Sequence, residues 1–108
     1  MIRILSVFFV VLTGNAQAQE GWATWYGNEH GQYRRADGAR YNPSILGFAC
    51  RGYRLGSMHR ITNLSNGRSI FIPCNDRAGY GVPAGGIDLS KGAARLLGIS
   101  GRAKVRIE

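Results

Sequence analysis

Hydrophobic and polar side chains alternate over several short stretches of the chain, a pattern typical of β-strands that bury one face. It predicts strands over 21–26, 58–63, 68–72, 87–89 and 103–107, with a further short apolar run at 45–49. Asn66 and Gly67 tolerate positive φ, so they predict a tight turn between the second and third of these strands. Pro73 is expected to end the third strand, because proline cannot donate a hydrogen bond to a sheet.

One helix is predicted near the C-terminus. Ser90 can accept a hydrogen bond from the first turn, and Gly98 can adopt the left-handed conformation that ends a helix, so the helix should run to Leu97. Two polar, glycine-containing segments, 27–42 and 74–86, are expected to be long loops. Six short strands and one helix favour a closed, mainly β barrel, since closure removes exposed sheet edges.

The composition fits a single small domain that is rich in turns. The chain has 108 residues, of which 16 are glycine and 3 are proline. Its length and pattern exclude a multidomain enzyme, a membrane channel and a coiled coil. A domain of this size buries only a small core, so a covalent constraint would contribute much of its stability.

Residues 1–18 are predicted to be a signal peptide. Arg3 gives a positively charged start, residues 4–12 form a largely apolar run that is too short to span a bilayer, and Ala16-Gln17-Ala18 is typical of a signal-peptidase site. Cleavage after Ala18 would leave a single domain, 19–108. The alternative is an uncleaved N-terminal anchor. We expect a periplasmic or secreted protein with no stable membrane anchor.

Cys50 and Cys74 are the two cysteines of the chain. In an oxidising compartment they are the one possible intramolecular pair, so a disulfide is predicted. The alternatives are a free nucleophilic thiol and half of a metal site. His30 and His59 are not spaced from the cysteines as in a zinc finger, and no base that would activate Cys50 can be identified. The sequence therefore predicts no metal and no cofactor.

The chain is strongly basic, with 14 Lys and Arg against 6 Asp and Glu and a net charge of +8. This charge suits three partners: the carboxylates and phosphates of a cell wall, anionic lipid, or nucleic acid. Export argues against nucleic acid. The arginines are dispersed and form no basic run, which also fits a solvated surface of a monomer that merely favours anionic polymers.

Several short motifs occur in the order found in one known family. They are Trp25-Tyr26-Gly27, His30-Gly31, Ala36-Asp37-Gly38, Thr62-Asn63-Leu64-Ser65-Asn66-Gly67-Arg68-Ser69, Asn75-Asp76-Arg77 and Ile87-Asp88-Leu89-Ser90. Through them the chain resembles the rare lipoprotein A (RlpA) family over nearly all of residues 19–108. The resemblance implies a six-stranded double-psi β-barrel with one short helix, a fold shared with expansins and barwin-like plant proteins. It also implies an endolytic lytic transglycosylase that cleaves peptidoglycan glycan strands lacking stem peptides.

The chain departs from the pattern of that family after Arg77, where Ala78-Gly79-Tyr80 stands in place of the usual Gly-Pro-aromatic sequence, and at two further positions. Ala39 stands where the family often has Glu, and Cys50 stands where it has His. These departures keep an alternative open, in which the protein is a non-catalytic, expansin-like module that binds the cell wall.

Asp76 is the candidate catalytic residue. A lytic transglycosylase protonates the glycosidic oxygen and then takes a proton from the C6 hydroxyl of the muramic acid sugar, and one carboxyl group can perform both steps. Asp76 keeps its family motif and is predicted at the junction of a strand and a loop. In the other interpretation Asp76 only braces the loop, by accepting backbone N–H bonds or pairing with Arg77. Asp88 is expected to fix the turn into the helix at Ser90.

The candidate substrate-binding residues are aromatic or basic side chains in or beside the predicted loops. Aromatic rings offer faces on which sugar rings stack, although strand alternation predicts that about half of the aromatic residues belong to the core. His30 is a candidate by resemblance, and Arg77 adjoins Asp76. The set comprises Tyr26, His30, Tyr33, Arg77 and Tyr80.

Overall fold

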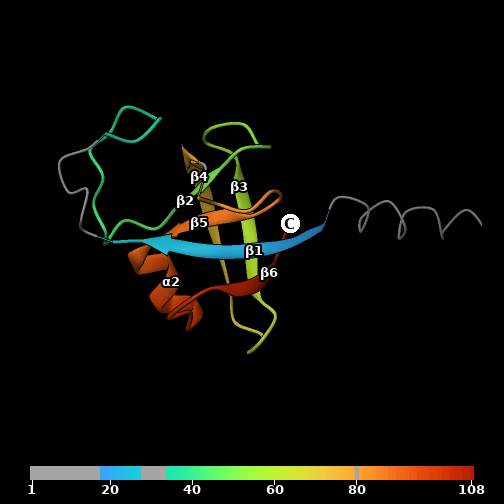
Figure 1. Cartoon of the computed structure of the whole chain (residues 1–108). Helices are drawn as coiled ribbons and strands as arrows, with labels where there is room; N and C mark the ends of the chain where they lie inside the picture. The colour runs from blue at the N-terminus through green and yellow to red at the C-terminus, as the bar shows by residue number, and fades with distance from the viewer. Residues whose placement is uncertain (1–17, 28–33, 80) are drawn as a thin grey trace, which may run out of the picture.

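The computed structural model of the chain describes residues 18–27, 34–79 and 81–108. Within these ranges six strands form a closed barrel in the spatial order β1-β5-β2-β4-β3-β6, and a short helix, α2, lies at the end of the barrel where β1 and β5 finish (Figure 1). The predicted mainly β barrel with one short helix is confirmed. The elements are β1 (Gln19–Tyr26), β2 (Phe48–Cys50), β3 (Met58–Asn63), β4 (Ser69–Arg77), β5 (Ile87–Ser90), α2 (Lys91–Leu97) and β6 (Ala103–Ile107).

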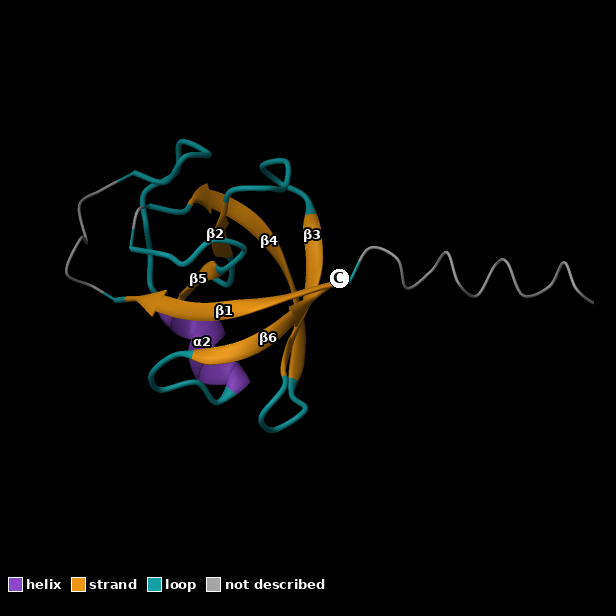
Figure 2. Cartoon of the chain, turned by 45° about the vertical axis from the view of Figure 1, so that its right-hand side comes forward, coloured by secondary structure: helices purple, strands orange, loops and turns teal. Residues whose placement is uncertain are grey.

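The barrel encloses apolar side chains from all six strands. Alternation along each strand selects them: in β6 Val105 and Ile107 are buried, whereas Lys104 is exposed. Burial of each large aliphatic side chain contributes about 1.5–3 kcal/mol. The helix packs against the barrel and adds its apolar face to the same core (Figure 2). The helical members of the core are Ala93, Ala94 and Leu97.

Strand β4 is longer than the sequence predicts. It continues through Pro73 to Arg77, so the prediction that Pro73 ends the strand is wrong, as is the prediction of a loop from Cys74 onward. The reason is that β4 has a different neighbour on either side of the proline. Up to Pro73 it is antiparallel to β3, and from Cys74 it is parallel to β2. Pro73, which lacks an N–H, thus lies where the strand changes partners.

The predicted disulfide between Cys50 and Cys74 is confirmed. It joins β2 to β4, with the two Cα atoms 5.9 Å apart. Both sulfur atoms are buried in the barrel core. The bond therefore links the two strands through the interior.

Both ends of α2 are capped as the sequence predicts. The Ser90 hydroxyl accepts a hydrogen bond from the Ala93 N–H, at 3.3 Å. At the other end Gly98 has φ 72°, and its N–H and that of Ile99 bond to carbonyls of the last turn. α2 has seven residues. Within the ranges described, no helix is long and apolar enough to cross a membrane.

Replacing Ser90 with alanine is expected to lower the free energy of unfolding by about 1 kcal/mol, because the Ala93 N–H would lose its acceptor. Urea denaturation followed by circular dichroism would measure the change. Ser90→Thr serves as the control, since it keeps the hydroxyl and should restore most of the loss. Equal stability of wild type and Ser90→Ala would contradict the capping role.

Candidate functional site

Four residues from four neighbouring strands lie in one row across the outer surface of the barrel. Thr24 of β1 pairs with Asp88 of β5, Asp88 pairs with Ala49 of β2, and Ala49 pairs with Asp76 of β4. Strands in a sheet are about 4.8 Å apart, so the backbones of the two aspartates are separated by about 10 Å. Two carboxylates therefore flank Ala49 on the same face.

A β-bulge turns Asp76 to this outer face. Phe48 pairs with Cys74, but the next residue of β2, Ala49, pairs with Asp76. Asn75 is the additional residue of β4. In a regular strand Asp76, two residues after Cys74, would point into the core as Cys74 does, and the bulge turns it outward instead. The bulge fixes the direction of the carboxyl group.

The bulge is maintained at some energetic cost. The amide group of Asn75 lies directly against Gly47, where any Cβ would overlap it. Asn75 Oδ1 is buried, and it has no hydrogen-bond partner among the described residues. A buried oxygen without a protein partner is unfavourable, so its position calls for an explanation. Asn75 directly precedes Asp76, so the bulge and the candidate carboxyl group occupy the same end of β4.

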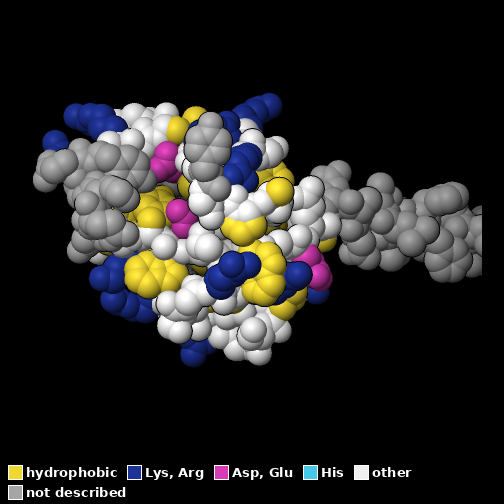
Figure 3. All heavy atoms as spheres, in the orientation of Figure 1, with side chains coloured by type: hydrophobic (Ala, Val, Ile, Leu, Met, Phe, Trp, Pro, Cys, Tyr) yellow, Lys and Arg dark blue, Asp and Glu magenta, His cyan; other side chains and the backbone are white. Residues whose placement is uncertain are grey.

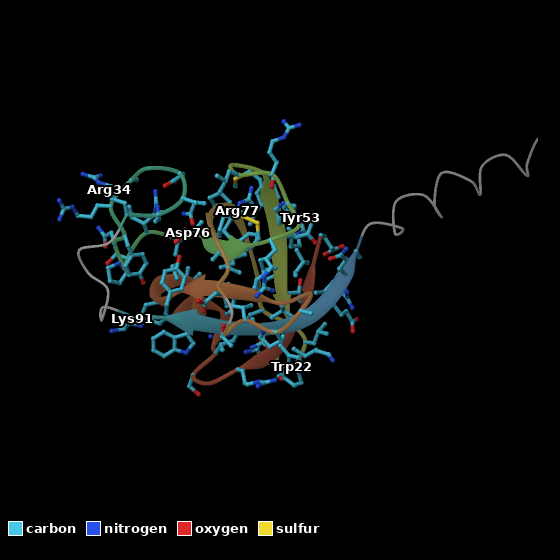
Figure 4. All side chains as sticks on the ribbon, turned by 45° about the horizontal axis from the view of Figure 1, so that its top comes forward. Trp22, Arg34, Tyr53, Asp76, Arg77 and Lys91 are labelled. Carbon is cyan, nitrogen blue, oxygen red and sulfur yellow. A yellow bond between two sulfur atoms is a disulfide. The ribbon has the colours of Figure 1, made fainter. Side chains whose placement is uncertain are left out.

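Asp76 is held rigidly in the site. It is 7% exposed. Its Oδ1 accepts hydrogen bonds from the backbone N–H groups of Ala36 and Arg77, each at 2.8 Å. Figure 4 shows Asp76 below the loop that carries Arg34. The bracing interaction that the sequence suggests is therefore present, and it brings the loop against the carboxyl group.

The loop above Asp76 contains a tight hairpin, residues 34–40. The Arg35 guanidinium donates two hydrogen bonds to the Asp37 carboxylate, at 3.0 and 2.9 Å, and the Ala39 N–H donates a third. Partial burial opposes ionisation of Asp37, but these donors outweigh it and hold the pKa of Asp37 below its usual value. Gly38 turns the chain with φ 94°. Ala39 lies in this hairpin and offers no carboxyl group.

An aromatic cluster lies beneath the loop, separate from the barrel core. It consists of Tyr26, Tyr41 and Ala49, with Ala78 packed against it. The two rings are 4.7 Å apart, and the Tyr41 hydroxyl donates to the Tyr26 carbonyl at 2.9 Å. Tyr26, a predicted substrate-binding residue, is 8% exposed. Tyr26 therefore packs within the cluster and offers little ring surface on which a sugar could stack.

Arg77 points away from Asp76 toward the turn after β2. Its guanidinium donates to the Tyr53 carbonyl at 2.7 Å (Figure 4). This contact anchors the turn, and a role of Arg77 in substrate binding stays a prediction. The other predicted binding residues, His30, Tyr33 and Tyr80, lie outside the described residues, as does the predicted signal peptide up to residue 17.

The sequence analysis missed Asp88 as a member of the site. Its Oδ1 accepts a hydrogen bond from the Thr24 hydroxyl at 2.8 Å, which connects β5 to β1. The buried neighbours Ile87 and Leu89 indicate that Asp88 faces outward, and this part of the pattern is visible in the sequence. Its place in the row with Asp76 depends on strand order, which the sequence does not show.

No histidine or free thiol of the described residues adjoins Asp76. Cys50, at the position where the resemblance gives His, is bonded to Cys74 inside the barrel. His59 lies on β3, where its ring contacts Tyr53 at 4.2 Å. In the part of the chain that the structure describes, no three His, Cys, Asp or Glu side chains form a group that could hold a metal ion.

Comparison with known proteins identifies the family. The family described as "Lytic transglycolase" matches residues 18–108. The chain belongs to this family. It is 44% identical over 93 residues to a probable endolytic peptidoglycan transglycosylase RlpA from Nostoc, a match that covers 82% of this chain and 25% of the relative. It is 41% identical over 91 residues to the endolytic peptidoglycan transglycosylase RlpA of Yersinia pestis, covering 84% of this chain and 25% of the relative.

The chain therefore spans about a quarter of the length of these curated relatives. Among solved structures, an expansin of Clavibacter michiganensis superposes with a TM-score of 0.65 at 19% identity, covering 85% of this chain and 50% of the expansin. At this identity the likeness concerns the fold alone. The resemblance to the RlpA family and to the double-psi β-barrel that the sequence suggests is confirmed.

Proposed function

We propose that this chain is an extracytoplasmic lytic transglycosylase domain that cleaves peptidoglycan glycan strands lacking stem peptides. The observation that carries the proposal is the position of Asp76. A bulge turns this carboxyl group out of the barrel, and two backbone donors hold it beneath a loop. The family to which the chain belongs, and relatives named as peptidoglycan transglycosylases, supply the reaction class.

The proposed reaction needs one carboxyl group in two roles. Protonated Asp76 gives its proton to the glycosidic oxygen as the bond between that oxygen and C1 of the muramic acid sugar breaks. The oxygen of the C6 hydroxyl of the same sugar then bonds to C1 and closes a 1,6-anhydro ring. The hydroxyl proton passes to the Asp76 carboxylate, which restores the acid. No water is consumed, and no cofactor takes part.

The rigid setting of Asp76 suits this chemistry. A group that acts first as acid and then as base must stay within hydrogen-bond distance of two oxygens of one sugar. The Ala36 and Arg77 N–H groups fix Oδ1, and the bulge fixes the direction of the side chain. Little reorganisation would then be needed between the two proton transfers.

A second candidate function is non-catalytic binding to the wall. One observation favours it: the positions at which the resemblance gives Glu and His carry Ala39 and Cys50, and the Cys50 sulfur is bonded to Cys74. In this alternative the same face binds glycan strands and leaves them intact. The surplus of Lys and Arg supports attraction to an anionic wall in both cases.

The experiment that tests the proposal is digestion of purified sacculi. Sacculi would be stripped of stem peptides with an amidase, incubated with the protein and analysed by mass spectrometry. We expect soluble fragments with 1,6-anhydro ends from stripped sacculi and few or none from untreated sacculi. Protein that sediments with both kinds of sacculi but releases no fragments would establish the binding module instead.

The location and assembly of the protein follow from the same proposal. A buried disulfide fits an oxidising compartment, and a peptidoglycan substrate lies outside the cytoplasm. We place the protein in the periplasm or the extracellular medium as a monomer, after cleavage near Ala18. N-terminal sequencing of protein recovered from the periplasm would test the cleavage position.

A further inference from the structure

A hollow beside α2 combines an aromatic ring with two cations. It has a volume of about 170 Å³ and is lined by Trp25, Lys91, Ala94, Arg95 and Ile99. Trp25 is 36% exposed, and its ring is held in place because Nε1 donates to the Ser100 carbonyl at 3.0 Å. The ring is therefore an oriented, accessible wall of the hollow.

A second hollow continues from the first. It has a volume of about 360 Å³, and it is lined by Pro43, Ser44, Gly92 and the same two cations, Lys91 and Arg95. The two hollows therefore lie on either side of the same two cations, and together they are called the groove below.

The positive charges of Lys91 and Arg95 are not neutralised by any acidic side chain of the described residues. Neither Lys91 nor Arg95 has an ion pair or a side-chain hydrogen bond among the described residues. They are four residues apart on one helix, where like charges repel. Lys91 also lies in the first turn, which has no acidic residue, and a cation there opposes the helix dipole. Arg95 lies in the last turn, where a cation is favourable to the dipole, so only Lys91 is placed unfavourably. Two cations that face one hollow and have no anionic partner among the described residues suit an anionic ligand.

Trp22 provides a contrast on the same strand. Its ring lies under the cationic groups of Arg102 and Lys104, at 4.7 and 4.9 Å from the ring centre. Figure 3 shows Lys and Arg side chains beside exposed hydrophobic side chains along β1. At Trp22 the cations lie over the ring, whereas at Trp25 they stand beside it and line a hollow with it. Unlike Trp22, Trp25 therefore shares a hollow with two cations, which a ligand that has both a ring and a negative charge could occupy.

The groove lies toward the same end of the barrel as Asp76 (Figure 4). Trp25 follows Thr24, which begins the row that ends at Asp76, and three strand spacings along this row amount to about 14 Å. In Figure 4 Lys91 and Asp76 lie toward the same end of the barrel. A polymer bound at Asp76 could therefore extend a few sugar rings and reach the groove.

We propose that the groove between Trp25, Lys91 and Arg95 is a subsite for a sugar that carries a carboxylate. The apolar face of the sugar ring packs on the indole, and the carboxylate binds the two cations. In a glycan strand without stem peptides this sugar is the muramic acid unit, whose lactyl carboxylate is exposed by removal of the peptide. This inference rests on the proposed function. It explains why the protein would prefer stripped strands: only in these strands is the carboxylate free to bind the groove.

Binding of the purified full chain to soluble stripped glycan strands tests the subsite. The ligand would be used in two forms, with free lactyl carboxylates and with the same carboxylates converted to neutral amides. We expect Lys91→Gln/Arg95→Gln to weaken binding of the acidic strands about tenfold and to leave binding of the neutral strands nearly unchanged. Melting curves would show that the variant is folded.

Arg102→Gln/Lys104→Gln is the matched control, because it removes the same charge from two cations that lie over Trp22 and do not line the groove. We expect it to weaken binding of the acidic strands by much less. Equal losses in the two double variants, or an equal loss on neutral strands, would overturn the subsite. The outcome is independent of cleavage: binding that follows the expected pattern without any 1,6-anhydro product would remove the proposed activity and keep the subsite.

Discussion

Asp76→Asn is expected to reduce cleavage of stripped glycan strands by about 10²–10⁴-fold while the protein remains folded. The amide has the shape of the carboxyl group, and its oxygen can still accept the hydrogen bonds from Ala36 and Arg77. It has no acidic proton to give to the glycosidic oxygen, however. The rate of release of 1,6-anhydro products, measured beside a melting curve, would show the loss of activity without loss of stability.

Asp76→Ala separates the bracing role from the chemical role. Alanine removes the acceptor of two backbone N–H groups at a site that is almost completely buried, so we expect the free energy of unfolding to fall by about 1–3 kcal/mol. An Asp76→Asn variant that cleaves as fast as the wild type would contradict the assignment of Asp76 as acid and base. If activity fell only in the variant that loses stability, Asp76→Ala, bracing would account for the residue.

Replacement of both cysteines by alanine is expected to lower the free energy of unfolding by roughly 3–4 kcal/mol. The disulfide closes a loop between residues 24 positions apart, which restricts the unfolded chain. Both sulfur atoms also fill the core, so the smaller side chains would add a further loss to this loop-closure value. Urea denaturation of the double variant and of the wild type would measure the difference.

The reduced wild-type protein is the control for packing, because it keeps both sulfur atoms and loses only the bond. It should be intermediate in stability between the oxidised protein and the double variant. If reduction left the urea midpoint unchanged, the disulfide would contribute nothing to stability. The loss would then have to be assigned to the core alone.

Sequence patterns predicted most strands and the helix, because the residues within each element determine its type and its ends. The alternation in 103–107 defines β6, and Ser90 and Gly98 define the ends of α2 through their own hydrogen bonds and backbone conformation. The strand through Pro73 was not predicted. Its continuation depends on a change of partner from β3 to β2, and pairing between distant segments leaves no local signal.

The candidate site was predicted less completely for the same reason. Asp76 was found through its motif, but the direction of its side chain depends on the bulge at Asn75, which exists only when β2 and β4 are paired. Asp88 joins the site through strand order. The groove at Trp25 forms because β1 ends beside α2, which brings a tryptophan next to cations from a distant part of the sequence.

The most direct measurement of the central claim is the mass of the new glycan ends formed in water enriched in heavy oxygen. Intramolecular attack by the C6 hydroxyl consumes no water, so the account predicts ends that carry a 1,6-anhydro ring and no heavy oxygen, and it predicts that Asp76→Asn forms few or none of them. New ends that carry heavy oxygen would show hydrolysis, and a complete absence of new ends with the wild-type protein would show that the domain does not cleave. Either result would contradict the assignment of this domain as a lytic transglycosylase.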